Sequence, residues 1–115
     1  MKAVVYDKYA PNDDYKSILS VKEIPDPKPK PNEVVFRVKA AALNYNDIWG
    51  MRGQPVAVPL PHVSGSDAAG EVIAIGEDVT NFKVGDRVVS HSNMSCRVCE
   101  ACTDGREYDC TKRTI

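Results

Sequence analysis

The four cysteines of the chain lie within fifteen residues, in the spacing C-x2-C-x2-C-x7-C. Zn²⁺ in structural sites takes four ligands in a tetrahedral cage, and cysteine thiolates are among its preferred ligands. Gaps of two residues let the backbone curl so that successive sulfurs point at one centre. The pattern therefore predicts one structural zinc site, with the ligands Cys96, Cys99, Cys102 and Cys110. Because four thiolates close the coordination shell, this site leaves no position for a substrate.

Three other states of these cysteines stay open: disulfides, free thiols and an iron–sulfur cluster. Disulfides are disfavoured because Met1–Asp7 reaches an acidic residue before any apolar stretch that would form a signal peptide. A cytosolic protein keeps its thiols reduced. The bacterial ferredoxin pattern continues with x3-C-P, whereas here seven residues precede Cys110 and Thr111 follows it. We therefore expect zinc, in a cytoplasmic protein.

Length and charge narrow the class of protein further. A chain of 115 residues with 43% hydrophobic content is enough for one domain with one core. Its 15 basic and 16 acidic residues are interspersed, with a formal net charge of -1. Around the cysteines, four basic residues are offset by four acidic ones: Arg97, Arg106, Lys112 and Arg113 against Glu100, Asp104, Glu107 and Asp109. Aliphatic runs are far shorter than the roughly 20 residues of a membrane span. We expect neither a nucleic acid nor a membrane as partner.

A second group of residues that can do chemistry lies where strands give way to turns. Residues 42–50 and 61–70 carry amide, hydroxyl and carboxylate side chains, namely Asn44, Tyr45, Asn46, Asp47, Ser66 and Asp67. Loops on a rigid scaffold are common places for sites. The structural alternative is that Asn44 or Asn46 caps a helix and Asp67 binds backbone in a turn. His62 and His91 lie near these segments, but lone histidines are more often structural.

The elements that must position these residues are mostly strands. Apolar residues recur with period two near residues 4–6, 18–24 and 34–40, and β-branched runs opened by glycine cover 70–76 and 85–90. Only residues 44–51 look helical. Proline occupies every other position of 25–31, which predicts a stiff, extended connector and not a PxxP ligand. The domain is therefore predicted to be mainly β.

These segments, in this order and separation, resemble the N-terminal catalytic domain of the medium-chain dehydrogenase/reductase superfamily. The family's Gly-His-Glu-x2-Gly-x5-Gly-x2-Val motif is matched in part by Gly65, Gly70, Gly76 and Val79, and its G-D-R-V strand by residues 85–88. The cysteines match its structural zinc lobe. The resemblance implies a GroES-like, partly open β-barrel over residues 1–115, with one or two short helices. A four-cysteine zinc lobe over residues 92–115 would protrude from one side.

The chain departs from the alcohol dehydrogenases of this family at the catalytic metal. Where they carry a Cys-x-Thr/Ser-Asp motif, this chain has Asn44 to Asp47, and their His-Glu pair is replaced by Ser66-Asp67. Neutral amide and hydroxyl groups are poor ligands for zinc. The pattern that remains resembles the zinc-free quinone reductases and the enoyl-thioester reductases.

This resemblance implies an oxidoreductase that reduces a conjugated carbonyl of a small-molecule substrate with NADPH or NADH. Charge that collects on an enolate oxygen would be stabilised by Asn44, Tyr45 and Asn46, of which Tyr45 and Asn46 would also contact the cofactor. Asp47 would orient its neighbours, and Ser66 and Asp67 would line the wall that zinc would have occupied.

The sequence also indicates what the chain lacks on its own. It contains no Gly-x-Gly-x-x-Gly, so the dinucleotide-binding Rossmann domain of the family is absent from it. We expect the first part of a longer, homo-oligomeric enzyme, inactive when isolated. Two alternatives remain: a zinc-dependent alcohol dehydrogenase domain, and a stand-alone zinc-stabilised β module for binding or assembly without catalysis.

Overall fold

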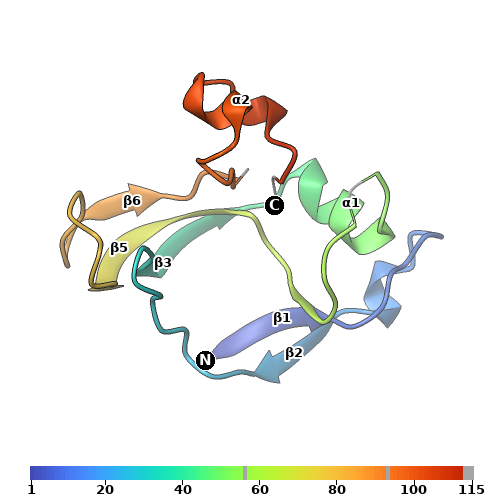
Figure 1. Ribbon diagram of the computed structural model, residues 1–115. Coiled ribbons are helices and arrows are strands. Elements are labelled where there is room, and N and C mark those ends of the chain that lie inside the picture. Colours follow the sequence, from blue (N-terminus) through green and yellow to red (C-terminus); the bar gives the residue numbers. More distant parts are fainter. Residues whose placement is uncertain (56, 93, 113–115) are drawn as a thin grey trace.

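The computed structural model describes residues 1–55, 57–92 and 94–112, and its elements form two three-stranded antiparallel sheets (Figure 1). The smaller sheet has the order β2-β1-β4, with β1 at Lys2–Tyr6, β2 at Ser20–Glu23 and β4 at His62–Val63. The larger has the order β3-β5-β6, with β3 at Val34–Ala42, β5 at Asp67–Ile75 and β6 at Arg87–Val89. The α-helices are α1 at Tyr45–Arg52 and α2 at Glu100–Thr103, and the 3-10 turns are η1 at Tyr15–Ser17 and η2 at Glu107–Asp109. The predicted mainly β fold with one or two short helices is confirmed.

The long pairing of β3 with β5 brings the two polar segments of the sequence together. The register runs from Val34 opposite Ile75 to Ala42 opposite Asp67, with irregularities in pairing after Val35 and after Val38. Because β3 ends at Ala42 and β5 begins at Asp67, the residues that follow one strand lie beside those that precede the other. The sheet thus positions the candidate site at one of its ends.

The period-two pattern of the larger sheet marks strands, but only part of its apolar residues is buried: Val72 in β5 is 0% exposed, and other apolar residues of the sheet are open. Val38 in β3 is 54% exposed, Ile73 in β5 is 44% exposed and Val89 in β6 is 76% exposed. Apolar side chains on an antiparallel strand normally pack against another layer. Within the described residues these side chains remain largely open to solvent.

The core instead joins the smaller sheet to α1. Its buried residues come from β1, the loop after it, the residue that follows η1, α1 and the segment before β4: Tyr6, Ala10, Ile18, Met51 and Val58. Two hydrogen bonds tie these pieces together. The Tyr9 hydroxyl donates to the Val58 carbonyl at 2.7 Å, and the Ala10 amide donates to the Met51 carbonyl at 2.8 Å. Helix α1 is therefore fixed against β1.

The ends of α1 follow from local sequence. The Asn44 side chain accepts a hydrogen bond from the Asn46 amide at 3.0 Å, and the Asp47 carboxylate accepts one from the Asn44 amide at 2.8 Å. This reciprocal arrangement is a capping box. At the other end Gly53 adopts φ 72°, a left-handed conformation that glycine takes without steric cost. The sequence left Asn44 and Asn46 as alternative caps, and the structure selects Asn44.

Two glycines of the family-like motif are places of close backbone approach. A Cβ at Gly70 would collide with the Arg37 carbonyl of β3, and one at Gly76 would collide with the backbone of Lys30 and Pro31. Gly76 therefore lets the turn after β5 pack on the proline-rich connector. That connector has no regular secondary structure over residues 24–30 and leads from β2 to β3.

The four-cysteine segment forms a small unit of its own after β6, with α2 and η2 packed together (Figure 1). The predicted zinc lobe of residues 92–115 includes positions 93 and 113–115, among them Arg113, which lie outside the described residues. In the described part of the chain no helix is long and apolar enough to cross a membrane.

Candidate functional site

The two predicted polar segments meet through one side-chain contact. The Asn44 amide nitrogen Nδ2 donates to Asp67 Oδ2 at 2.6 Å. Asn44 also caps α1 through its Oδ1, so both the oxygen and the nitrogen of its side-chain amide form hydrogen bonds within the protein. This contact fixes the start of α1 to the start of β5.

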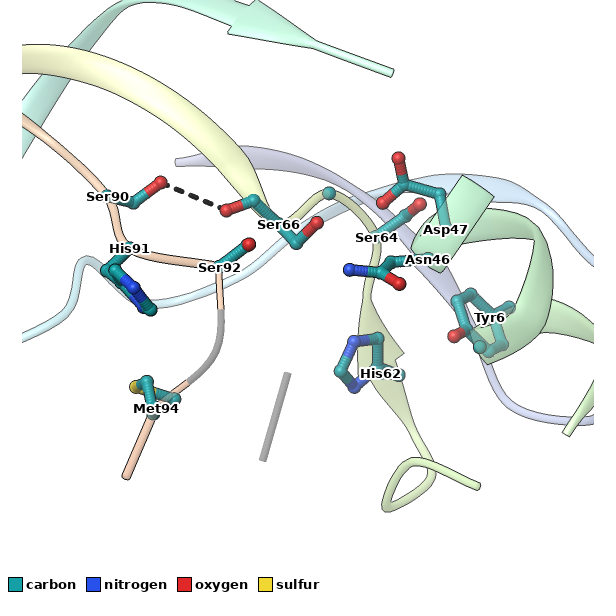
Figure 2. Close-up of a pocket in the computed structure, with 12 residues that line it drawn as sticks. Tyr6, Asn46, Asp47, His62, Ser64, Ser66, Ser90, His91, Ser92 and Met94 are labelled. Carbon is teal, nitrogen blue, oxygen red and sulfur yellow. Dashed lines mark hydrogen bonds between the residues drawn. The ribbon is translucent and has the colours of Figure 1, made fainter. Parts of the chain in front are cut away.

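A cavity of about 250 Å³ opens beside this contact (Figure 2). It is lined by residues from β1, α1, β4, the loop before β5 and the segment after β6: Tyr6, Asn46, Asp47, Gly50, His62, Ser64, Gly65, Ser66, Ser90, His91, Ser92 and Met94. Three of the six predicted site residues, Asn46, Asp47 and Ser66, therefore lie around one space.

The other predicted residues lie elsewhere. Asn44 and Tyr45, together with Asp47, line a second and more apolar cavity of about 740 Å³. Asp67 lines neither of these two cavities and serves Asn44. The structure thus separates the predicted set into residues that face the first cavity, residues at the second cavity, and Asp67, which holds Asn44.

Asn46 is the amide best placed to act on a ligand. It is partly buried at the cavity wall, and its side-chain amide makes no hydrogen bond within the described parts of the chain. An unpaired amide offers two N–H donors. Its backbone amide is held by Asn44, so its position at the helix start is fixed.

Ser66 faces the same cavity with an unused hydroxyl. Its Oγ is buried and has no hydrogen-bond partner among the described residues. Its backbone is held by Ser90, whose Oγ donates to the Ser66 carbonyl at 3.0 Å and accepts from the Ala68 amide at 2.9 Å (Figure 2). β5 and the segment after β6 are thereby joined across the site.

Sequence reasoning missed Tyr6 and treated His62 as more often structural. The two rings lie 5.4 Å apart between centroids, and both line the cavity. Burial, with smaller effects of Tyr9 and Asp47, raises the pKa of Tyr6 to about 12. Burial also lowers the pKa of His62. Both rings are therefore neutral at neutral pH. The sequence held no signal for Tyr6, which reads as an ordinary inward residue of β1.

Tyr45 is held by a polar cluster at the other end of α1. Arg52 Nε donates to the Asp13 carboxylate at 2.6 Å and to the Tyr15 hydroxyl at 3.0 Å. Arg52 Nη1 donates to the Tyr45 hydroxyl at 3.4 Å. Trp49 packs edge-on against the Tyr45 ring with centroids 5.5 Å apart. Tyr45 is nevertheless 57% exposed, so its ring is fixed but open to a ligand.

The four cysteine sulfurs come together as the spacing predicts. All four lie within 4.8 Å of one another, with Cys96 to Cys102 at 4.0 Å and Cys99 to Cys102 at 3.4 Å. Tetrahedral bonds of about 2.3 Å place thiolates roughly 3.8 Å apart, whereas a disulfide needs about 2.05 Å. The cysteines are free and their arrangement can hold a metal ion. Backbone amides of Val98 and Cys99 lower the pKa of Cys96 to about 6, whereas burial raises the pKa of Cys102 to about 11, so the sulfur positions and not the pKa values support a metal site.

This chain has no comparable set of metal ligands at the positions where alcohol dehydrogenases bind their catalytic metal. The Asn44 amide and the Ser66 hydroxyl are neutral, and the Asp67 carboxylate accepts from Asn44. A thiolate, imidazole or free carboxylate is what zinc requires. These three side chains therefore do not fit a catalytic zinc.

Comparison with known proteins identifies the family. Residues 30–115 match the family described as the alcohol dehydrogenase GroES-like domain. The chain belongs to this family. The resemblance to the medium-chain dehydrogenase/reductase superfamily is thereby confirmed.

Three relatives show the range of the GroES-like family near this chain. The acryloyl-coenzyme A reductase of Metallosphaera sedula is 37% identical over 98% of this chain and 32% of its own length. A structure named as NAD-dependent alcohol dehydrogenase superimposes with a TM-score of 0.86 and 41% identity, over 100% of this chain and 33% of that one. A crotonyl-CoA carboxylase/reductase gives a TM-score of 0.83 at 30% identity, over 100% of this chain and 28% of that one. This chain thus spans about a third of each relative.

Proposed function

We propose that this chain is the N-terminal catalytic-domain portion of an NADPH-dependent oxidoreductase that reduces a conjugated carbonyl, foremost an enoyl thioester and then a quinone. The observation that carries the proposal is the cavity beside α1, where Asn46 presents an unpaired amide and two of the positions that hold metal ligands in alcohol dehydrogenases are the neutral Asn44 and Ser66. Its similarity to acryloyl-coenzyme A reductases supports the thioester class.

Reduction of a conjugated carbonyl requires hydrogen-bond donors at the carbonyl oxygen and does not require a metal. NADPH, when bound by the rest of the enzyme, supplies hydride to the carbon β to the carbonyl. Negative charge then collects on the carbonyl oxygen, and a proton from solvent at the α carbon completes the reduction. Donors fixed in advance at that oxygen lower the barrier. The Asn46 amide is such a donor, because its side chain is unpaired and its backbone is held by the Asn44 cap.

The other predicted residues support this arrangement. Asp47 accepts from the Asn44 backbone and so fixes the helix start that presents Asn46. Ser66 gives the cavity a buried hydroxyl without a partner among the described residues, and Asp67 holds Asn44 in place. Tyr45, fixed by Arg52 and open to a ligand, is our candidate for contact with the cofactor together with Asn46.

The four cysteines are proposed to hold one structural zinc ion. Their sulfurs lie at distances that fit a tetrahedral cage, and four ligands leave no open position. The metal would stabilise the segment after β6, which also contributes Ser90 and Met94 to the cavity.

A second candidate is an alcohol dehydrogenase, because the structure named NAD-dependent alcohol dehydrogenase is 41% identical. Alcohol oxidation in this family relies on a metal to stabilise the alkoxide. The neutral donors at Asn44 and Ser66 favour the reductase. A stand-alone module without catalysis would leave the unpaired amide of Asn46 without a role.

The test measures oxidation of NADPH by the full-length protein with acryloyl-CoA, crotonyl-CoA and a quinone, and reduction of NAD⁺ with primary and secondary alcohols. We expect turnover with the thioesters. Asn46→Ala should lower kcat by roughly 10²- to 10³-fold, as removal of an oxyanion donor does. Asn81→Ala, in an exposed turn between β5 and β6, is the matched control and should leave kcat unchanged. Turnover of alcohols alone would favour the dehydrogenase, and no turnover would favour the module.

A further inference from the structure

The Tyr6 hydroxyl opens on the same cavity from beneath α1. Tyr6 is the last residue of β1 and is only 2% exposed, yet it is among the residues that line the cavity. Figure 2 shows it on the side of Asn46 and His62, with its oxygen toward His62. A tyrosine buried to this degree is expected to have its hydroxyl paired.

The fold holds this phenol in one place. Its ring belongs to the core cluster that includes Met51 and Val58. A Cβ added at Gly50 would lie 2.9 Å from the Tyr6 oxygen, so the hydroxyl passes directly beneath a helix position that has no side chain. The packing therefore fixes the direction in which the O–H group can act.

The hydroxyl is nevertheless unpaired within residues 1–55, 57–92 and 94–112. Burial and nearby charges account for its pKa, and no hydrogen bond contributes. Tyr9, three residues along, gives the contrast, because its hydroxyl donates to Val58 at 2.7 Å. The Tyr6 oxygen is reached from the cavity, whereas Ser66 Oγ is fully buried without a partner among the described residues. A hydroxyl that is left without a partner beside a cavity is available to a polar occupant, and Tyr6 and Ser66 both border this one.

The charge of the lining selects the kind of occupant. The described lining residues include the carboxylate of Asp47 but no lysine or arginine. The Tyr6 phenol stays protonated, since its pKa is about 12, and burial keeps His62 neutral at neutral pH. A carboxylate or phosphate would face the Asp47 carboxylate with no lysine or arginine of the described lining to offset the two charges. A neutral carbonyl oxygen, in contrast, accepts from such donors without a charge penalty.

We propose that the Tyr6 hydroxyl donates a hydrogen bond to the carbonyl oxygen of the acyl substrate, as a second donor beside Asn46. This inference rests on the proposed reductase function and adds a residue that the sequence did not indicate. The phenol acts as a donor only and keeps its proton throughout the reaction.

The experiment compares Tyr6→Phe with Tyr9→Phe in the full-length protein. Each change removes one hydroxyl from the same core, but only Tyr6 faces the cavity. Tyr6→Phe should lower kcat/KM for crotonyl-CoA roughly tenfold, the effect of one hydrogen bond, and leave Tm unchanged or higher. Tyr9→Phe should do the reverse, lowering Tm with kcat/KM unchanged, because it breaks an internal hydrogen bond.

Each other outcome has a definite meaning. Unchanged kcat/KM in an active Tyr6→Phe enzyme overturns the assignment alone and leaves the hydroxyl to a bound water. A Tm lowered as much as in Tyr9→Phe overturns it too, since the hydroxyl would then be paired within the fold. If the wild-type enzyme reduces no enoyl thioester, the proposed function and this assignment both fall.

Discussion

The amide nitrogen of Asn44 lies 2.6 Å from the carboxylate of Asp67, and through this contact the first residue before α1 is joined to the first residue of β5. Two segments that are far apart in sequence thereby form one corner of the candidate site. The same asparagine caps the helix that presents Asn46.

Replacing Asn44 should separate its two roles. Asn44→Ala removes both the cap and the contact with Asp67, and should lower the free energy of unfolding by about 0.5–2 kcal/mol. Asn44→Ser keeps an oxygen that can cap and loses only the contact with Asp67, so its loss should be smaller. Urea denaturation measures both. Equal losses in the two variants would mean that the cap contributes little.

Gly50 and Tyr6 should be coupled in a double-mutant cycle. Alanine is normally favoured over glycine inside a helix by about 1 kcal/mol. At Gly50, however, the new methyl would lie 2.9 Å from the Tyr6 oxygen, so Gly50→Ala should destabilise the wild type. In a Tyr6→Phe background the same change should be neutral or stabilising. Additive effects in thermal denaturation would contradict the close approach of the two residues.

Metal removal should act on the segment after β6 first. A strong chelator is expected to abolish protection from hydrogen exchange over residues 96–110, because four thiolates without an ion have no other contact of comparable strength. Metal analysis of the full-length protein should give one zinc per chain. Cys102→Ser should lose that ion, and Thr111→Ala, at an exposed neighbour of Cys110, should keep it. Two zinc ions per chain would contradict our interpretation of Asn44 and Ser66, and a coloured protein would point to iron.

The free energy of unfolding should depend on pH at the acid end of the range, in part through Asp13. Hydrogen bonds from Arg52, and then from Tyr15, lower the pKa of Asp13 below its ordinary value of 3.8. A lowered pKa stabilises the fold above 3.8, and this contribution is lost as pH falls through the folded-state pKa. Asp13→Asn should therefore narrow the difference in Tm between neutral pH and a pH below 3.8. Asparagine also tolerates the left-handed φ of 64° at this position, so the backbone is kept. An unchanged difference in Tm would show that the exposed ion pair is screened by solvent.

Local patterns in the sequence were sufficient for the elements of the fold. Period-two apolar residues marked β3 and β5, and the asparagines before residue 47 marked the start of α1. The cysteine spacing predicted that four sulfurs would meet, since it depends on contacts within fifteen residues. The short helix α2 inside that segment was missed, because its sequence has too few residues to show helical periodicity.

The candidate site was only partly predictable, because it depends on which strands pair. Nothing local distinguishes Asn46, whose amide is unpaired, from Asn44, whose amide is taken by Asp67 after the β3–β5 pairing. Tyr6 reaches the cavity only because α1 packs on β1 with Gly50 above the phenol. The exposure of Val38 and Ile73 could not be predicted either, because alternating apolar residues are also what a buried strand face shows.

The capping box at the start of α1 also constrains how this domain can evolve. A cysteine at position 44 would supply a thiolate for a catalytic metal, as in the alcohol dehydrogenases of the family, but it would leave the helix without its cap and Asp67 without its donor. A first mutational step toward the metal-dependent chemistry therefore costs stability before any ion can bind. The capping box thus couples folding and function at position 44, since one side chain cannot serve as helix cap and as metal ligand at once.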